Sequence, residues 1–310
     1  MSTDTHISYS PSNDYAQSAN TLFHFMKNPE YLTDILQRKA IIPRYCRENI
    51  DYLDLRNGEH KFNEIAILQK CFCDIPFHKF ADTFTVEGTG DIFNSLSQEQ
   101  QSTIIHTNTH FDYYGEYAIA FSKSWGETHN LQPIHYLNKD TQHTKDFSAL
   151  LNHCFSEKDI PSIFSNDAIN RLTYIKPLRG IMKRDTSFNT SQPVEIYKNF
   201  HDEREWRYVP SINILAPLKL KNIIANPALL STINITNEQL KDELYKNLWL
   251  TFSYDDIRYI IVPNTGARID IIKTILELSE SCFENKTDIS MQKNILISKI
   301  LVLEEIRKDW

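Results

Sequence analysis

Apolar residues along the chain follow strand-like and helix-like spacings that alternate from residue 21 onward. The run "LFHFM" (22–26) predicts a short strand. A helix is predicted next, because Asn28 can cap it, Pro29 suits its first position, and apolar residues recur at helical spacing. The same spacing rules predict strands at 64–77, 114–125, 132–137, 172–180, 199–210 and 255–263, and helices at 97–111, 146–167, 237–250, 269–283 and 290–310. Loops are predicted at 47–64, 78–96 and 181–198.

This order of elements predicts an α+β fold with a mixed or antiparallel central sheet, flanking helices and appended C-terminal helices. Residues 1–20 are polar and predict a flexible leader. Residues 21–275 are predicted to form one α+β domain, and residues 276–310 a C-terminal helical extension. The chain shows no internal repeat and no Gly-Ser linker, which favours a single domain.

The composition is that of a folded protein, and we expect it in the cytoplasm. Of the 310 residues, 41% are hydrophobic and 24% are charged, and neither a secretion signal nor a stretch of roughly 20 apolar residues is present. Five scattered cysteines predict reduced thiols. The net charge of −7 argues against bulk electrostatic coating of nucleic acid. Without a P-loop or a Gly-x-Ser-x-Gly elbow, ordinary kinases, P-loop NTPases and typical hydrolases are excluded.

The stretch "HDEREWRYVP" (201–210) has the densest charge pattern in a predicted strand. Residues two apart share a strand face, so Glu203, Glu205 and Arg207 are predicted to project together while Trp206 and Tyr208 face the core. One interpretation is an edge strand whose charges pair with one another. The other is a carboxylate that serves in binding or catalysis.

A strand histidine together with a Glu-x-Glu strand is the layout of the ADP-ribosyltransferase fold. In that chemistry positive charge grows on the ribose of NAD as the glycosidic bond breaks, and a fixed carboxylate stabilises it. Glu205 is then predicted as the catalytic carboxylate, Glu203 as the group that orients the acceptor or water, and His24 as the ligand of the NAD ribose. Further candidates for the NAD site are Arg207 and three aromatic residues, one of which would stack on nicotinamide: Tyr113, Tyr114 and Tyr117.

The cysteine and histidine spacings raise the alternative of a four-ligand metal site. Cys71 and Cys73 would share a strand face, and His106 and His110 are four apart on a predicted helix. Zinc sites show paired CxxC or tighter Cys/His spacing, and free cysteine is among the commonest buried residues. The sequence therefore predicts no metal.

Several segments in order resemble the AbiGi family of bacterial abortive-infection proteins, which confer phage resistance. The segments carrying the resemblance span about residues 22–275, and the most specific are "CFCDIP", "YGEYAIAFSKSW" and "EREWRYVP". The resemblance implies a cytoplasmic role in antiviral defence beside a partner protein, and some descriptions of the family call it an antitoxin. His110, in the family-like "HFDYYGEY", would line the same cleft as the NAD candidates. The chain departs from the family at Met26, where threonine is common, and at "YGEYAIA" in place of "YGxYGIG".

Two functions follow. In the first, the chain is an anti-phage effector that transfers ADP-ribose from NAD to a protein or nucleic acid acceptor, or hydrolyses NAD. In the second, it is a non-enzymatic antitoxin or sensor that binds a toxin, nucleic acid or phage component, and the 203–207 charges form a structural ladder. In either case the apolar run "NILISKILVL" (294–303) could serve oligomerisation or partner docking.

Overall fold

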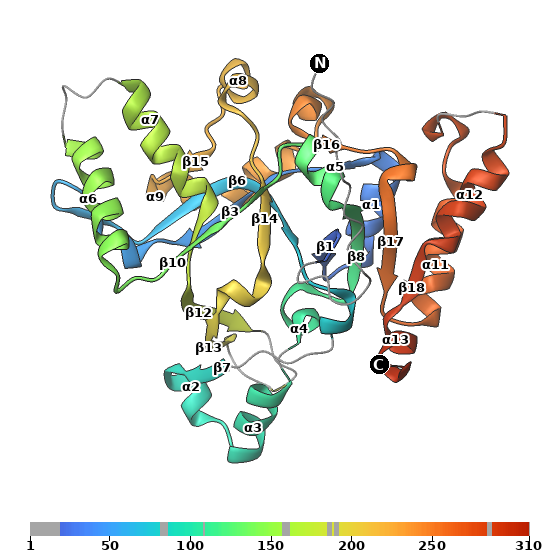
Figure 1. Cartoon of the computed structure of the whole chain (residues 1–310), viewed down its shortest axis with the longest axis horizontal. Coiled ribbons are helices and arrows are strands. Elements are labelled where there is room, and N and C mark those ends of the chain that lie inside the picture. Colours follow the sequence, from blue (N-terminus) through green and yellow to red (C-terminus); the bar gives the residue numbers. More distant parts are fainter. Residues whose placement is uncertain are drawn as a thin grey trace, which may run out of the picture.

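The computed structural model describes residues 19–80, 86–107, 109–156, 162–184, 188, 192–283 and 287–309. Most of the predicted leader therefore lies outside the described residues. Within them the largest sheet has nine strands (Figure 1). In spatial order its main path is β18 (Ile300–Val302), β17 (Ile257–Val262), β8 (Tyr117–Ser122), β1 (Thr21–Met26), β6 (Glu64–Cys73), β14 (Glu205–Tyr208) and β9 (Gln132–Pro133).

The long strand β6 joins two parts of this sheet. Its first half pairs with β3 (Arg44–Asn49) and β15 (Ile223–Ile224), and its last residues pair with β14 and β1. Every described pair in this sheet is antiparallel except β17 with β18, which is parallel. The α+β class and the mixed sheet are thus confirmed.

Smaller sheets surround this centre. They pair β2 (Ala40–Ile41) with β16 (Leu250–Thr251), β4 (Leu55–Asn57) with β5 (His60–Phe62), β10 (His135–Leu137) with β11 (Ile175–Pro177), and β13 (Val194–Asn199) with both β12 (Arg179–Arg184) and β7 (Val86–Thr89). Short 3-10 helices connect many of the elements: η1 (Asp51–Leu53), η2 (Phe77–Lys79), η3 (Arg171–Tyr174), η4 (Phe200–Glu203), η5 (Ala216–Leu218), η6 (Glu243–Leu248), η7 (Tyr254–Asp256) and η8 (Glu280–Cys282).

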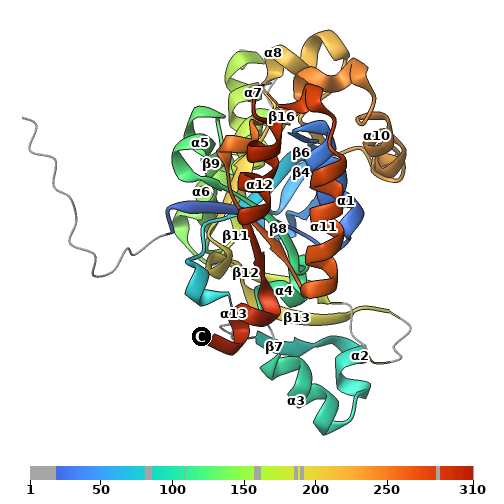
Figure 2. The ribbon, with the colours of Figure 1, turned by 90° about the vertical axis from the view of Figure 1, so that its right-hand side faces the viewer.

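The α-helices lie on both faces and at both ends of the sheet. They are α1 (Pro29–Arg38), α2 (Gly90–Ser95), α3 (Gln98–His106), α4 (His110–Tyr114), α5 (Lys123–Thr128), α6 (Gln142–Ser156), α7 (Ser162–Asn170), α8 (Ile212–Leu215), α9 (Pro227–Leu230), α10 (Ile233–Gln239), α11 (Thr265–Glu277), α12 (Ile289–Ser298) and α13 (Leu303–Asp309). Figure 1 shows α6 and α7 at one end and α11 and α12 at the other, and in Figure 2 α11 lies beside α1.

Strand β8 shows how the alternating pattern divides the core. Ile119 and Phe121 enter the cluster that contains the buried residues of α1 and α11, whereas Ala118 and Ala120 enter the opposite cluster with Phe23. Small residues on that second face let the phenylalanines of β1, η2 and α4 approach closely. Alternate residues of this strand thus lie on opposite faces of the sheet.

Several local predictions are wrong. The predicted loops contain β3, β4 and β5, then β7 and α2, and then the hairpin of β12 and β13. Strand β12 has no buried residue, so apolar alternation does not mark it. The predicted helix at 237–250 is broken into the end of α10, the 3-10 helix η6 and β16.

The predicted helix at 290–310 is interrupted by a strand. Between α12 and α13 the chain forms β18, which pairs in parallel with β17 at the edge of the central sheet. The segment 276–310 is therefore not an exclusively helical appendage. The domain limits at residues 20 and 275 stay predictions.

Candidate functional site

The opening of the charged stretch differs from the prediction. Glu203 ends the 3-10 helix η4, Arg204 adopts a left-handed conformation with φ 44°, and β14 begins only at Glu205. The prediction that Glu203 and Glu205 lie on one strand is wrong, because Glu203 belongs to η4 and Glu205 to β14. A turn, rather than strand periodicity, brings their carboxylates together, and both meet the ammonium group of Lys176.

Glu203 is held by cations on both of its oxygens. Lys176 Nζ donates to Oε2 at 2.7 Å, and Lys198 Nζ donates to Oε1 at 2.9 Å. The Tyr114 hydroxyl also donates to Oε1. Lys198 further lies 4.6 Å above the ring of Tyr113, in cation–π geometry.

Glu205 is held in the same way from the other side. Arg207 Nε donates to Oε1 at 2.6 Å, and Lys176 Nζ donates to Oε2 at 3.1 Å. The Arg207 guanidinium also donates to Glu48 Oε1 at 2.9 Å and to the Thr173 carbonyl at 3.0 Å. Three carboxylates thus face three cations, an arrangement that is close to neutral as a whole.

The core of this network is closed to solvent. Glu203 is 2% exposed, Glu205 4%, Lys198 1% and Arg207 0%. The interpretation as a solvated edge strand is wrong, since β14 lies between β6 and β9 and its charges are buried. Its pairing of charges is confirmed, and the predicted core positions of Trp206 and Tyr208 are confirmed by their packing in the main hydrophobic cluster.

The charges fix the ionisation of both glutamates. Burial alone would raise the pKa of Glu205, but Arg207 and Lys176 outweigh it and lower the pKa to about 2. Burial likewise opposes ionisation of Glu203, and the two lysines hold its pKa well below the ordinary value. Both side chains are therefore carboxylates near neutral pH, bound to cations rather than ready to accept a proton.

His110 lies next to this network. Its Nε2 lies 3.0 Å from Cys73 Sγ, and its ring centroid is 4.7 Å from that of Tyr114. Burial lowers the pKa of His110 to about 3, so the imidazole is neutral.

The predicted His106–His110 helix is wrong, because the two histidines belong to α3 and α4. The five cysteines are unpaired, and among the described residues no group of three or more His, Cys, Asp or Glu is arranged to hold a metal.

A cleft of about 480 Å³ opens beside the network, between β1, α1, β3, β6 and α10. It brings together three of the predicted NAD-site residues, His24, Tyr113 and Tyr114. The cleft does not include Glu203, Glu205, Arg207, His110 or Tyr117 among its described lining residues. Tyr117 instead packs against the main hydrophobic cluster.

Sequence reasoning found Arg207 but missed the other partners of the network, Lys176, Lys198 and Glu48. Lys176 and Lys198 come from β11 and β13, and Glu48 comes from β3. For Lys176 the available signal was a single charge within the otherwise apolar run "YIKP". That signal marks a buried charge without naming its partner.

Comparison with known proteins gives the family. The family model described as "Putative abortive phage resistance protein AbiGi, antitoxin" matches residues 102–263, just over half of the chain. A protein of Lactococcus lactis subsp. cremoris, "Abortive phage resistance protein AbiGi", is 33% identical over 282 residues, covering 87% of this chain and 100% of the relative. The chain belongs to the AbiGi family. The resemblance drawn from the sequence motifs is confirmed.

Within this AbiGi chain most of the ion network lies in the region that the family model matches. Of the network, Lys176, Lys198, Glu203, Glu205 and Arg207 fall inside residues 102–263, whereas Glu48 precedes them. No solved structure matches the chain, so the ADP-ribosyltransferase-like part of the fold prediction has no support from a structural neighbour. None of the described helices has the length and apolar character needed to cross a membrane.

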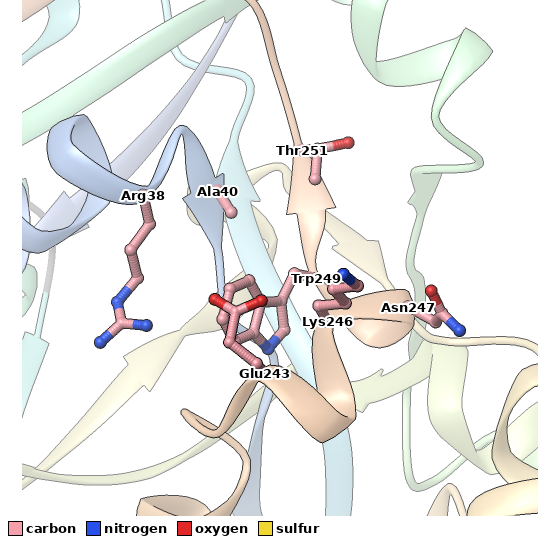
Figure 3. A pocket seen from close by; sticks show the side chains of 7 residues that line it. All are labelled: Arg38, Ala40, Glu243, Lys246, Asn247, Trp249 and Thr251. Carbon is pink, nitrogen blue, oxygen red and sulfur yellow. The ribbon is translucent and has the colours of Figure 1, made fainter. Parts of the chain in front are cut away.

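A second hollow of the AbiGi chain, also about 480 Å³, lies at the C-terminal end of α1. Figure 3 shows its lining, to which α1 contributes Arg38, β2 contributes Ala40, and the 243–251 segment contributes the rest. Two cations line it, Arg38 and Lys246, and Arg38 is bound to Asp34 at 2.6 Å and lies 5.4 Å from the Trp249 ring centroid.

Proposed function

We propose that this chain acts in anti-phage defence as an antitoxin-type component, which binds and restrains a partner toxin. The family description names an antitoxin, and the full-length relative is named for abortive phage resistance. The net charge of −7 suits a protein partner better than nucleic acid.

The observation that carries this proposal is the engagement of every oxygen of the Glu203–Glu205 pair. Each oxygen accepts a hydrogen bond from Lys176, Lys198 or Arg207, and both side chains are almost fully buried. A carboxylate that stabilises positive charge on a substrate must face that substrate, and its field must not be cancelled by adjacent cations. The pair is better suited to holding β14, β11 and β13 together than to catalysis.

The transferase hypothesis keeps one favourable observation. His24, Tyr113 and Tyr114 line one cleft, and Tyr114 also donates to Glu203, which links the cleft to the carboxylates. Transfer of ADP-ribose from NAD therefore stays a second candidate, and Glu205 would need to leave its cation partners to take part.

Expression in a bacterial host separates these functions. We expect the chain alone to leave growth and cellular NAD unchanged, because the oxygens of Glu203 and Glu205 are already bound by cations. Co-expression with its partner toxin, sought among the products of neighbouring genes, should restore growth that the toxin alone arrests. The matched variant is Glu205→Gln, compared with the exposed Glu64→Gln, and folding of each is checked by thermal melting. Growth arrest or NAD loss caused by the native chain and abolished only by Glu205→Gln would overturn the proposal.

A further inference from the structure

Two cations at the cleft have no counter-charge among the residues that the structure describes. Lys70 and Arg44 both line it, Lys70 half-buried on β6 and Arg44 exposed on β3. Across the described residues neither side chain forms an ion pair or a hydrogen bond. Burial lowers the pKa of the Lys70 ammonium, and the neighbouring Arg44 charge lowers it further. A half-buried cation beside a second cation is costly unless an anion joins them.

The acidic residues of the cleft do not supply that anion. Asp34 binds Arg38 at 2.6 Å, and Glu238 binds Lys241 at 2.6 Å. Each acid is therefore already compensated. The charge of Lys70 and Arg44 remains, so the cleft attracts a negatively charged group.

His24 adds a hydrogen-bond acceptor to the same cleft. Its Nδ1 lies 2.9 Å from the Cys71 carbonyl oxygen, which can only accept, so Nδ1 carries the proton. Burial, together with the Lys70 charge, lowers the pKa of His24 to about 3, so the ring is neutral and Nε2 keeps its lone pair. Among the described residues Nε2 has no hydrogen-bond partner. It is available to a hydroxyl group of a ligand.

Aromatic side chains complete the lining. Phe25, Tyr113 and Tyr114 line the cleft. Tyr31 of α1, which is 47% exposed, lines it as well. Such rings offer faces on which a planar heterocycle can stack. A volume of about 480 Å³ lies within the range of small-molecule sites.

We propose that this cleft binds a nucleotide, with its phosphate at Lys70 and Arg44, a ribose hydroxyl at His24 Nε2 and its base against the tyrosines. A phosphate supplies the missing negative charge, a sugar supplies the hydroxyl donor, and a base uses the aromatic surface. The proposal does not depend on the antitoxin role. A nucleotide bound here would touch Tyr114, which contacts Glu203, so occupancy of the cleft is connected to the buried network.

Calorimetric titration of the full chain tests this with AMP, ADP, NAD, adenosine and inorganic phosphate at low salt. We expect a nucleotide to bind at least tenfold more tightly than adenosine, which lacks the phosphate, and than phosphate, which lacks the ring. Added salt should weaken nucleotide binding.

Lys70→Gln and Arg44→Gln should each weaken nucleotide binding at least tenfold, whereas Lys61→Gln, whose ammonium pairs with Asp54 outside the cleft, should not. Lys70→Gln should also melt at the same or a higher temperature, because it removes an uncompensated charge. This distinguishes lost binding from lost folding. Absence of nucleotide binding by the native chain at millimolar concentration, or binding that both cleft variants retain, would overturn the proposal. NAD consumption in the same titration would instead support the transferase hypothesis and refute the non-enzymatic one.

Discussion

Replacement of Lys198 by methionine removes one of the two ammonium groups that bind Glu203. The side chain keeps its approximate volume, so the change acts mainly on charge. Removing one partner of a buried ion pair costs about 3–5 kcal/mol, because the other charge is left uncompensated. Glu203 keeps Lys176 at 2.7 Å and the Tyr114 hydroxyl, so we expect the lower end, about 3 kcal/mol. This is a large fraction of the about 5–15 kcal/mol that stabilises a typical fold.

Urea unfolding followed by tryptophan fluorescence measures this loss as a lower midpoint at unchanged slope. The matched control is Lys308→Met, because Lys308 pairs with Glu304 at 3.3 Å with side chains 70% and 57% exposed. An exposed pair of this kind contributes about 0–1 kcal/mol. A second variant, Lys198→Met with Glu203→Gln, removes both charges and should be more stable than Lys198→Met alone.

Two outcomes would refute the reasoning. If the free energies of unfolding of Lys198→Met and Lys308→Met differ by less than about 0.5 kcal/mol, Glu203 is either protonated or reached by water. If the losses from Lys198→Met and Glu203→Gln simply add, the two groups are not coupled.

Two further predictions concern acid and backbone strain. Because the pKa of Glu205 is lowered to about 2 in the folded chain, its stabilisation is complete above its ordinary value of 4.5 and is lost as pH falls towards 2. The urea midpoint should fall over this window, and less steeply in Glu205→Gln; equal slopes would contradict the prediction. Gly115→Ala should cost more than about 2 kcal/mol on thermal melting, because φ is 100° and the new Cβ would lie 2.2 Å from the Met26 carbonyl oxygen. Gly58→Ala, at φ 62° with no atom within 4 Å, should cost only about 1 kcal/mol, and equal losses would exclude the steric contact as the cause.

The local elements that the sequence predicted well are those with strong one-sided burial or a complete cap. Helix α1 follows its apolar spacing, and a capping box between Ser97 and Gln100 begins α3. Strand β17 likewise follows its apolar run at 257–262. Strands β12 and β18 escaped prediction because the first buries no residue and the second is short and lies between helices. Their strand conformation depends on pairing with another strand. Strand β12 pairs with β13, and β18 pairs with β17, and neither pairing can be recognised from local residue spacing.

The candidate site divides in the same way. Sequence reasoning selected His24, Tyr113 and Tyr114, which share a cleft, and Glu203 and Glu205, which share Lys176. Sequence reasoning placed the cleft residues and the carboxylates in one site. Residue type and spacing do not show which of these side chains are bound by cations.

The sequence by itself determined the α+β class, the strand and helix of 21–38, the two faces of β8 and membership of the AbiGi family. These properties depend on contacts between residues one to four apart or on the order of motifs along the chain. Only the tertiary structure decided that cations balance the charges of Glu203 and Glu205. It also decided that no described acidic side chain pairs with Lys70. Lys176 lies 27 residues from Glu203, and Arg207 lies 159 residues from Glu48. The charge balance of a buried group is therefore set by strand order and register, which bring distant segments of the chain together.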